Sequence, residues 1–309
     1  MTMSTYKSLS KVYNKSKIIP YNNQSKFVIM SDCHRGAGNL GDNFLKNQHL
    51  FFAALKNYYE KGFTYIELGD GDELWENRTM EKIIDIHSNS LWLMSKFYDE
   101  KRLYMIYGNH DMQKKDKTFI VNNFSEYYCE TRKKVCPLFP NIEVHEGLIL
   151  ENEDDKNQRI FLAHGHQGDL INDKLAKIGR FLVRYFWRTM EIWGVNDPTA
   201  AGKNFTKKNK VERRLMKWAE IEKKIFIAGH THRPTFPIVG EGMYFNDGSC
   251  VHPRCITALE IEEGKITLVK WCVMTREDRS MYVERVVLEG PEKIEDYFEL
   301  NNDNAKAET

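Results

Sequence analysis

Five short motifs along this chain each place a metal-binding type of side chain directly after an apolar, strand-like run. In order they are Asp32-Cys33-His34, Gly69-Asp70, Gly108-Asn109-His110-Asp111, His164-Gly165-His166 and Gly229-His230-Thr231-His232. Because ligands collect at the carboxyl ends of strands in α/β folds, we expect these five strand ends to meet. Carboxylates, imidazoles and one carboxamide suit Mn, Fe or Zn better than an all-oxygen Mg or Ca site. The motifs therefore predict a metal site built from distant parts of the chain.

The spacing of apolar residues predicts an α/β fold. Apolar runs at 26–31, 64–68 and 103–107 predict buried strands, and helical spacing at 44–61 and 77–100 predicts the helices between them. This β-α-β-α-β order favours a sandwich that begins with a mainly parallel sheet.

The pattern changes in the C-terminal half of the chain. Strands are predicted at 142–150, 159–163, 225–228 and 243–245, followed by a hairpin of 256–262 and 265–273 about Glu263-Gly264. We expect these strands to form a second sheet, either mixed or antiparallel.

Residues 167–224, between the fourth and fifth motifs, are predicted to form an inserted helical cap. Aromatic side chains are dense at 170–195 and basic ones at 203–217. The aromatic face either packs on the sandwich, which is the commoner arrangement, or encloses a substrate such as a lipid. The basic run is either a solvated helix face or an anion-binding surface beside the metal site.

Composition narrows the class of protein. The chain has 309 residues, 41% of them hydrophobic, and a formal net charge of +1. Such a chain can bury a large core, and its charge disfavours nucleic acid as a partner. No apolar run approaches the roughly 20 residues of a membrane span. Residues 1–21 lack the apolar core of a signal peptide. We therefore expect a cytoplasmic protein with reduced cysteines, among them Cys33 as a buried apolar side chain.

Two ligand positions each have two candidates. Cations about 3.5–4 Å apart need a shared ligand, and a carboxylate can bridge them with its two oxygens. Asp70 is the expected bridge because it directly follows a predicted strand, while Asp72 repeats the Gly-Asp pattern two residues later. For the same reason His164 is favoured as a ligand over His166, which either lines the substrate pocket or is a surface loop residue.

The motifs D-x-H, G-D, G-N-H-D/E, a strand-ending H and G-H-x-H together resemble those of the calcineurin-like metallophosphoesterase superfamily, from Lys26 to Val273 apart from the cap. The resemblance implies a four-layer α/β/β/α sandwich of two mixed sheets with the cap inserted. The domain of residues 26–300 then lies between an N-terminal extension, 1–25, and a polar tail, 301–309. The resemblance also implies two divalent metal ions, with Mn favoured over Fe or Zn.

The resemblance assigns ligands and a mechanism position by position. One ion takes Asp32, His34, Asp70 and His232, and the other takes Asp70, Asn109, His164 and His230. A hydroxide that bridges the ions attacks phosphorus directly. His110 stabilises the transition state or protonates the leaving group, and Asp111 orients and charges the imidazole of His110.

Two charged neighbours of the motifs each have two possible roles. Arg35 is predicted to bind substrate phosphate, because its guanidinium forks onto phosphate oxygens; its second possible role is a surface salt bridge. Glu73 either supports the ligands from outside or is a solvated loop carboxylate.

We therefore expect an enzyme, a dinuclear metal-dependent phosphoesterase acting on a phosphorylated or pyrophosphate-containing substrate. The cap and Gly229-His230-Thr231-His232-Arg233-Pro234 are similar to the UDP-2,3-diacylglucosamine diphosphatase branch, which cleaves a pyrophosphate in a lipid precursor. That branch has Gly-Asp where this chain has Gly165-His166. If the substrate is a lipid, the cap is the candidate for peripheral contact with it.

Three further functions are compatible with the motifs. One is a phosphoprotein phosphatase. Another is a nuclease, which the neutral charge and the lack of a basic groove with stacking aromatic residues disfavour. The third is a non-catalytic metal-binding scaffold, which the His110-Asp111 pair disfavours, because a scaffold needs the ligands but no acid.

Overall fold

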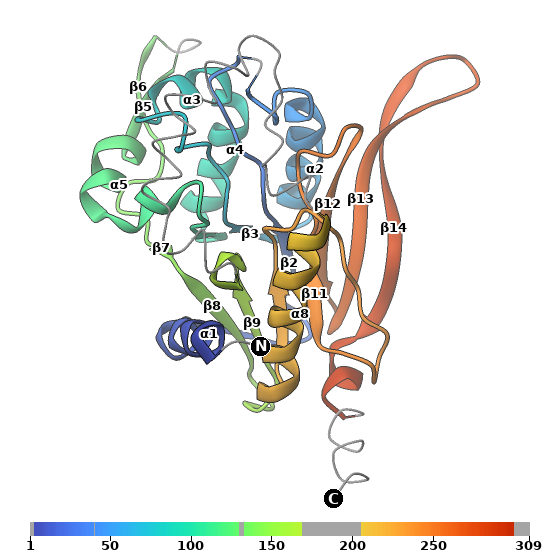
Figure 1. The fold of residues 1–309 in the computed structure, drawn as a ribbon. Coiled ribbons are helices and arrows are strands. Elements are labelled where there is room, and N and C mark those ends of the chain that lie inside the picture. Colours follow the sequence, from blue (N-terminus) through green and yellow to red (C-terminus); the bar gives the residue numbers. More distant parts are fainter. Residues whose placement is uncertain (1–2, 40, 130–132, 169–204, 300–309) are drawn as a thin grey trace, which may run out of the picture.

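A computed structural model describes residues 3–39, 41–129, 133–168 and 205–299 (Figure 1). Most of the predicted cap, residues 169–204, and the predicted tail, 301–309, lie outside these described residues. Within the described ranges, no helix is both long and apolar enough to cross a membrane.

The larger sheet has seven strands in the order β14-β13-β12-β2-β3-β4-β7. Their bounds are β2 Phe27–Met30, β3 Thr64–Leu68, β4 Leu103–Ile106, β7 Val144–His145, β12 Cys255–Glu262, β13 Lys265–Thr275 and β14 Met281–Lys293. The strands β2, β3, β4 and β7 run parallel, and β12, β13 and β14 are added antiparallel. The parallel part follows from the β-α-β-α-β order of the sequence, since parallel neighbours need crossover connections.

The smaller sheet has five strands in the order β1-β8-β9-β10-β11. Their bounds are β1 Lys17–Tyr21, β8 Gly147–Asn152, β9 Arg159–Ala163, β10 Ile225–Ala228 and β11 Tyr244–Asn246. This sheet is mixed, because β8 and β9 pair antiparallel while the other neighbours are parallel. The remaining strands, β5 Glu126–Cys129 and β6 Lys134–Pro137, form a separate antiparallel pair.

Helices cover the outer face of each sheet (Figure 1). On the five-stranded sheet they are α1 Met3–Lys15 and α8 Phe205–Glu222; on the seven-stranded sheet they include α2 Gln48–Glu60, α3 Glu81–Ile86 and α4 Ser88–Asp99. The short helix η1 Met112–Lys115 and α5 Lys117–Phe124 follow β4, and η2 His166–Gly168 follows β9. One apolar core fills the space between the sheets and under α1 and α8, and a second lies under α2 and α4. The predicted four-layer α/β/β/α sandwich of two mixed sheets is confirmed.

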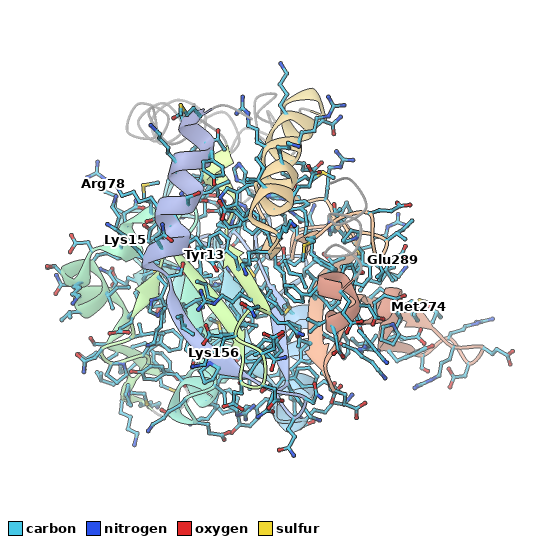
Figure 2. The ribbon with its side chains drawn as sticks, turned by 90° about the horizontal axis from the view of Figure 1, so that it is seen from below. Tyr13, Lys15, Arg78, Lys156, Met274 and Glu289 are labelled. Carbon is cyan, nitrogen blue, oxygen red and sulfur yellow. The ribbon has the colours of Figure 1, made fainter. Side chains whose placement is uncertain are left out.

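The C-terminal part of the predicted cap is an outer-layer helix of the sandwich. Trp218 of α8 is fully buried, and its ring centre lies 5.1 Å from that of Phe161 in β9 and 5.7 Å from that of Tyr13 in α1. Figure 2 shows Tyr13 on α1, on the same side of the five-stranded sheet as α8. The basic residues Lys210, Arg213 and Lys217 lie on the exposed face of α8. This alternation of buried and exposed residues is typical of a helix that packs with one face on a sheet.

Two predictions about elements are wrong in part. The single helix over 77–100 is broken into α3 and α4 at His87, whose φ and ψ are −105° and 22°. Its Nε2 lies 2.8 Å from Oδ2 of Asp42, and this buried pair fixes the break. The hairpin about Glu263-Gly264 forms as predicted, but it joins the first sheet, because β12 pairs with β2 and places Leu259 opposite Ile29.

Residues 1–25, predicted as an N-terminal extension, supply α1 and β1. The strand β1 pairs in parallel with β8, and Leu9, Val12 and Ile19 are buried in the core. The sequence did not predict these elements or β14. In α1, polar residues interrupt the apolar positions, and β14 lies at an exposed edge of its sheet.

Candidate metal centre

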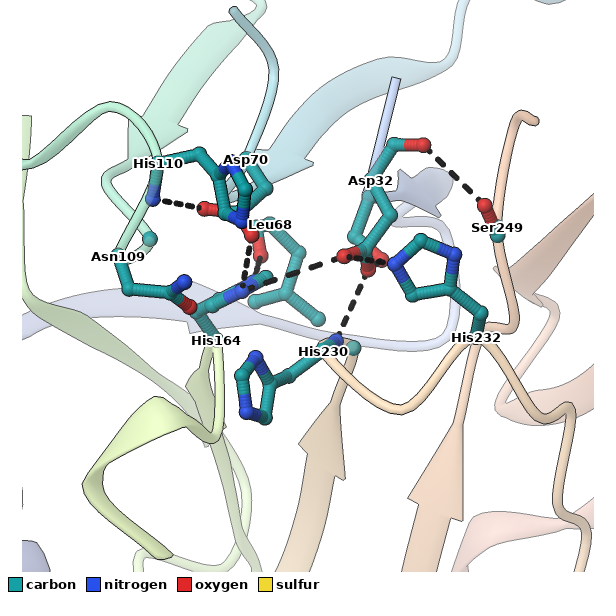
Figure 3. A network of polar contacts seen from close by, with 12 residues as sticks. Asp32, Leu68, Asp70, Asn109, His110, His164, His230, His232 and Ser249 are labelled. Atoms are coloured by element: carbon teal, nitrogen blue, oxygen red, sulfur yellow. Dashed lines mark hydrogen bonds and ion pairs between the residues drawn. The ribbon is translucent and has the colours of Figure 1, made fainter. Parts of the chain in front are cut away.

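The five motifs follow five strands whose carboxyl ends face one another across the two sheets (Figure 3). In the seven-stranded sheet, β2 leads to Asp32 and His34, β3 leads to Asp70, and β4 leads to Asn109 and His110. β9 and β10 of the five-stranded sheet lead to His164 and to His230 and His232. The side chains therefore come together because both sheets present parallel strand ends to the same region.

The first group of donor atoms surrounds Oδ1 of Asp32. Nε2 of His232 lies 3.1 Å and Nε2 of His34 lies 3.6 Å from this oxygen. Donors that share one metal ion at bond lengths of about 2.0–2.2 Å are separated by roughly 3 Å or slightly more. These three side chains therefore have the spacing that one cation requires.

The second group surrounds Oδ2 of Asp70. Nε2 of His164 lies 3.1 Å from this oxygen, and a ring nitrogen of His230 completes a group of donors that all lie within 4.8 Å of one another. The same Oδ2 is 3.9 Å from Nε2 of His34, a member of the first group. Asp70 thus lies between the two groups, in the position expected of a shared ligand.

One oxygen of Asp70 faces the donors and the other is held by the backbone. Oδ1 accepts a hydrogen bond of 2.8 Å from the backbone N–H of His110. A Cβ on Gly108 would lie 2.1 Å from this oxygen, so glycine is needed there for the two loops to approach. Oδ2 is therefore the oxygen of Asp70 that faces the imidazoles of His164 and His34.

Several buried donor atoms make no hydrogen bond within the part of the chain that the structure describes. Oδ1 of Asp32, Nε2 of His34, Oδ1 of Asn109 and Nε2 of His164 have no hydrogen-bond partner among the described residues. Nδ1 of His164 donates to the carbonyl oxygen of Leu68 at 2.9 Å, so Nε2 is the ring nitrogen that could bind a cation once it has lost its proton. Unpaired buried polar atoms are costly, and cations would satisfy all four. The residues present therefore fit a pair of divalent ions.

The backbone is left-handed at most of the candidate ligands. Asp32, His34, Asp70, His230 and His232 have φ between 48° and 67°. Non-glycine residues adopt this region rarely, and such conformations gather at functional sites where the surrounding structure enforces them.

The carboxylates and imidazoles of the site shift one another's pKa values. Burial raises the pKa of Asp32, but the nearby His232 and His164 lower it well below its ordinary value. Burial alone would lower the pKa of His164, yet Asp70 and Asp32 raise it to about 9. His230 shows the opposite result, because burial and the neighbouring His164 lower its pKa well below the usual range. The carboxylates therefore favour the protonated form of His164, whereas burial and His164 favour the neutral form of His230.

Asp32 is oriented by residues that the sequence did not indicate. Its Oδ2 accepts from the backbone N–H of His230 at 2.9 Å and lies 2.5 Å from Oγ of Ser31. The same Oγ lies 2.7 Å from Oδ1 of Asp247, whose pKa is raised well above normal by burial and by the charge of Asp32. These contacts occupy Oδ2 of Asp32 and leave Oδ1 for the donor group.

His110 is held by Glu73, and the predicted pairing with Asp111 is wrong. Nδ1 of His110 lies 2.8 Å from Oε2 of Glu73, and Nδ1 of His34 lies 3.1 Å from the same oxygen. The oxygens of Asp111 instead accept from the backbone N–H groups of Gly108 and Gly71. Adjacency in sequence is misleading here, because the side chain of Asp111 is turned beneath the loop.

Trp75 covers one face of His110. The two rings are stacked, with centres 4.2 Å apart and planes 13° apart. The indole N–H donates to the carbonyl oxygen of Asn109. Trp75 therefore fixes the plane of the imidazole and the loop that carries it, and no sequence pattern marked it.

A family model of calcineurin-like phosphoesterases matches residues 25–234. The chain belongs to the calcineurin-like phosphoesterase family. No curated protein matches the sequence. A crystal structure of Vps29 from Chaetomium thermophilum is similar over 86% of this chain and 99% of its own, with 12% sequence identity and a TM-score of 0.36. Family membership supports metal-dependent phosphoesterase activity, and the Asp and His groups described above are consistent with it.

In this calcineurin-like phosphoesterase, Arg35 is not placed to bind substrate. Its side chain is fully buried, with Nε 2.7 Å from Oδ1 of Asp72 and a terminal nitrogen 2.8 Å from Oε2 of Glu67. Both the phosphate clamp and the surface salt bridge expected for Arg35 are therefore wrong. The same pairing turns Asp72 away from the donor groups, which leaves Asp70 as the candidate bridge.

His166 lies beside the second donor group without being part of it. Its ring centre is 5.7 Å from that of His164, and burial together with His164 lowers its pKa to about 3. Nδ1 has no hydrogen-bond partner among the residues described. His166 is thus neutral at pH 7 and buried next to His164, and its place in the pocket lining stays a prediction.

Proposed function

We propose that this protein is a hydrolase of phosphate esters or phosphoric anhydrides that works with two divalent metal ions. The observation that carries the proposal is the pair of buried donor groups around Oδ1 of Asp32 and Oδ2 of Asp70, several atoms of which make no hydrogen bond among the described residues. One ion would be held by Asp32, His34, Asp70 and His232, and the other by Asp70, Asn109, His164 and His230. The mixture of carboxylate, imidazole and carboxamide favours Mn, Fe or Zn.

The two bound ions would lower the pKa of a water molecule toward neutrality and offset negative charge on the phosphoryl oxygens. The residues of the chain supply the remaining functions. Although burial lowers the pKa of His110, the charges of Glu73 and Asp70 raise it above its ordinary value, which favours the protonated imidazole. Since Glu73 occupies Nδ1, the Nε2–H of His110 is the group that donates to the leaving oxygen.

A catalytic role is favoured over a metal-binding scaffold by the arrangement around His110. A scaffold requires the ligands only, whereas here an imidazole that remains about a quarter exposed is oriented by a carboxylate and by a stacked indole. Such support of a proton donor is a requirement of catalysis and not of metal binding.

The test is a substrate panel on protein that has been stripped of metal and reloaded with Mn. We expect hydrolysis of at least one of p-nitrophenyl phosphate, bis-p-nitrophenyl phosphate, a phosphoserine peptide and UDP-2,3-diacylglucosamine. The last of these tests the proposed likeness to the pyrophosphatase branch. Single-stranded DNA tests whether the protein is a nuclease.

Two variants separate binding from turnover. Asp70→Asn should lose bound Mn, because the shared oxygen loses its charge. His110→Ala should retain both ions and lose on the order of 10²–10⁴-fold in kcat, which is the usual contribution of a general acid. Wild-type protein that binds Mn but cleaves no substrate in the panel would favour the scaffold. Full activity in either variant would overturn the assigned role.

A further inference from the structure

Five charged side chains form a fully buried cluster beneath the metal centre. The members of this buried charge cluster are Arg35, Glu67, Asp72, Asp111 and Lys114, each at most 1% exposed. None of them belongs to the donor groups described above. Buried ion networks contribute little to stability compared with well-packed apolar residues of similar volume, so the cluster needs another explanation.

Lys114 is the centre of the cluster. Its Nζ lies 2.7 Å from Oδ2 of Asp72, 2.7 Å from Oδ2 of Asp111 and 3.4 Å from Oε1 of Glu67. Arg35 contacts the other oxygen of Asp72 and also contacts Glu67. Two cations therefore compensate three carboxylates, and among the described residues Lys114 is the one whose ion pair joins Asp111 to the rest of the cluster.

The cluster is bonded to the backbone of the loops that carry ligands. Oδ1 of Asp111 accepts from the N–H of Gly108 at 2.7 Å, and Oδ2 accepts from the N–H of Gly71 at 3.0 Å. Gly71 directly follows Asp70, and Gly108 directly precedes Asn109. Asp111 therefore fastens the loop after β3 to the loop after β4, next to one ligand on each.

The loop after β3 rests directly on the cluster. A Cβ on Gly71 would lie 2.2 Å from Oε1 of Glu67 and 2.7 Å from a terminal nitrogen of Arg35. The backbone N–H of Arg35 donates to the carbonyl oxygen of Gly71 at 3.0 Å, and its own carbonyl oxygen accepts from the N–H of Glu73 at 2.9 Å. The path of the chain on either side of Asp70 is thus set by contact with buried charges.

We propose that Lys114, acting through Asp111, is a positioning residue for the ion held by Asp70, Asn109, His164 and His230. It fixes Asp111, and Asp111 sets the distance between the loops that carry Asp70 and Asn109. The ion at Asp32, His34, Asp70 and His232 depends less on Lys114, because it shares only Asp70 with these two loops and its ligand Asp32 is held by Ser31 and by the N–H of His230. This inference rests on the proposed two-metal function.

The test is isothermal titration calorimetry of Mn into metal-stripped protein. Lys114→Met alone would leave carboxylates without a cation, so it is combined with Asp72→Asn, which removes one positive and one negative charge together. The double variant should keep most of its thermal stability, because the carboxamide oxygen that Asp72→Asn introduces still accepts from Arg35. We expect one Mn to bind about 10–100-fold more weakly and the other within about threefold of wild type.

Asp111→Asn is the second variant and should weaken the same ion selectively. It keeps the volume of the side chain and is available if the double variant does not fold. The matched control is Arg285→Met, which breaks the ion pair of Arg285 with Glu260 in the same sheet, away from the ligands. This control should lower the melting temperature and leave both Mn affinities unchanged.

The outcomes separate the two proposals. Wild type that binds no Mn refutes the proposed function and this inference with it. The positioning role alone is refuted if wild type binds two Mn ions and the variants bind both ions with wild-type affinity. These variants are Lys114→Met/Asp72→Asn and Asp111→Asn. Equal weakening of both ions in these variants also refutes it, because a general loss of structure would then explain the result.

Discussion

Oε2 of Glu73 lies 2.8 Å from Nδ1 of His110. The same oxygen is 3.1 Å from Nδ1 of His34. Burial raises the pKa of Glu73, but the imidazoles of His110 and His34 lower it to about 2, so the carboxylate accepts from both rings. One oxygen thus orients both the proposed proton donor and a proposed metal ligand.

Glu73→Gln should impair turnover more than metal binding. The amide preserves the shape of the side chain but removes the charge that raises the pKa of His110. Because the acid form of His110 is the active one, a lower pKa should move the alkaline limb of the kcat profile to lower pH. We expect kcat to fall by about 10–100-fold at saturating Mn.

The control for Glu73 is Asp111→Asn, measured at saturating Mn. Asp111 makes no hydrogen bond or ion pair to His110 among the contacts of the described residues, so the alkaline limb should stay where it is in wild type. If the alkaline limb of the kcat profile shifted in Asp111→Asn and not in Glu73→Gln, Asp111 and not Glu73 would be the residue that orients His110.

Trp75→Leu tests the stacked indole. Removing an aromatic face from a charged imidazole costs about 0.5–2 kcal/mol, which corresponds to about 2–30-fold in kcat. Trp75→Phe retains a ring against His110 but loses the N–H that bonds the carbonyl of Asn109. We therefore expect kcat to be highest in wild type, lower in Trp75→Phe and lowest in Trp75→Leu. Equal kcat for Leu and Phe would show that the stack does not matter.

The two histidines after β9 should behave differently. Nε2 of His164 lies 3.1 Å from Oδ2 of Asp70, and its Nδ1 is bonded to Leu68. His164→Ala should therefore lose one of two Mn ions, as measured by elemental analysis. His166→Ala should keep both ions and change KM, because His166 adjoins the donors without joining them. Loss of an ion with His166→Ala alone would reverse the assignment.

The sequence predicted the meeting of the ligands because each one ends an apolar strand. Periodicity locates such strands, and β3 and β10 have the predicted bounds of 64–68 and 225–228. Asp70 was preferred to Asp72 because it directly follows the strand. The pairing of Asp72 with Arg35 supports this preference. Local pattern was therefore sufficient wherever a strand end fixes the position of a side chain.

Partners that depend on tertiary contacts could not be predicted. Arg35 follows a ligand in sequence, yet it lies at 0% exposure because Glu67 and Asp72 come from another strand and loop. Glu73 approaches His110 from a separate loop for the same reason. The hairpin of β12 and β13 carried no signal for the sheet it joins, because either sheet offers an apolar edge.

The metal-free protein should release protons when it binds Mn. Burial lowers the pKa of His164, but Asp70 and Asp32 raise it to about 9 from 6.5, so the ring is protonated at pH 7.5. A ligating imidazole is neutral, and Mn therefore displaces this proton. Affinity should rise with pH and level off near pH 9. In the metal-free protein, the raised pKa of His164 adds to the free energy of unfolding. This contribution is fully present below pH 6.5 and is lost as the pH rises through 9.

Calorimetry of Mn binding at pH 7.5 in buffers with different ionisation enthalpies measures the released protons. A binding enthalpy that is independent of the buffer would contradict the protonated state of His164.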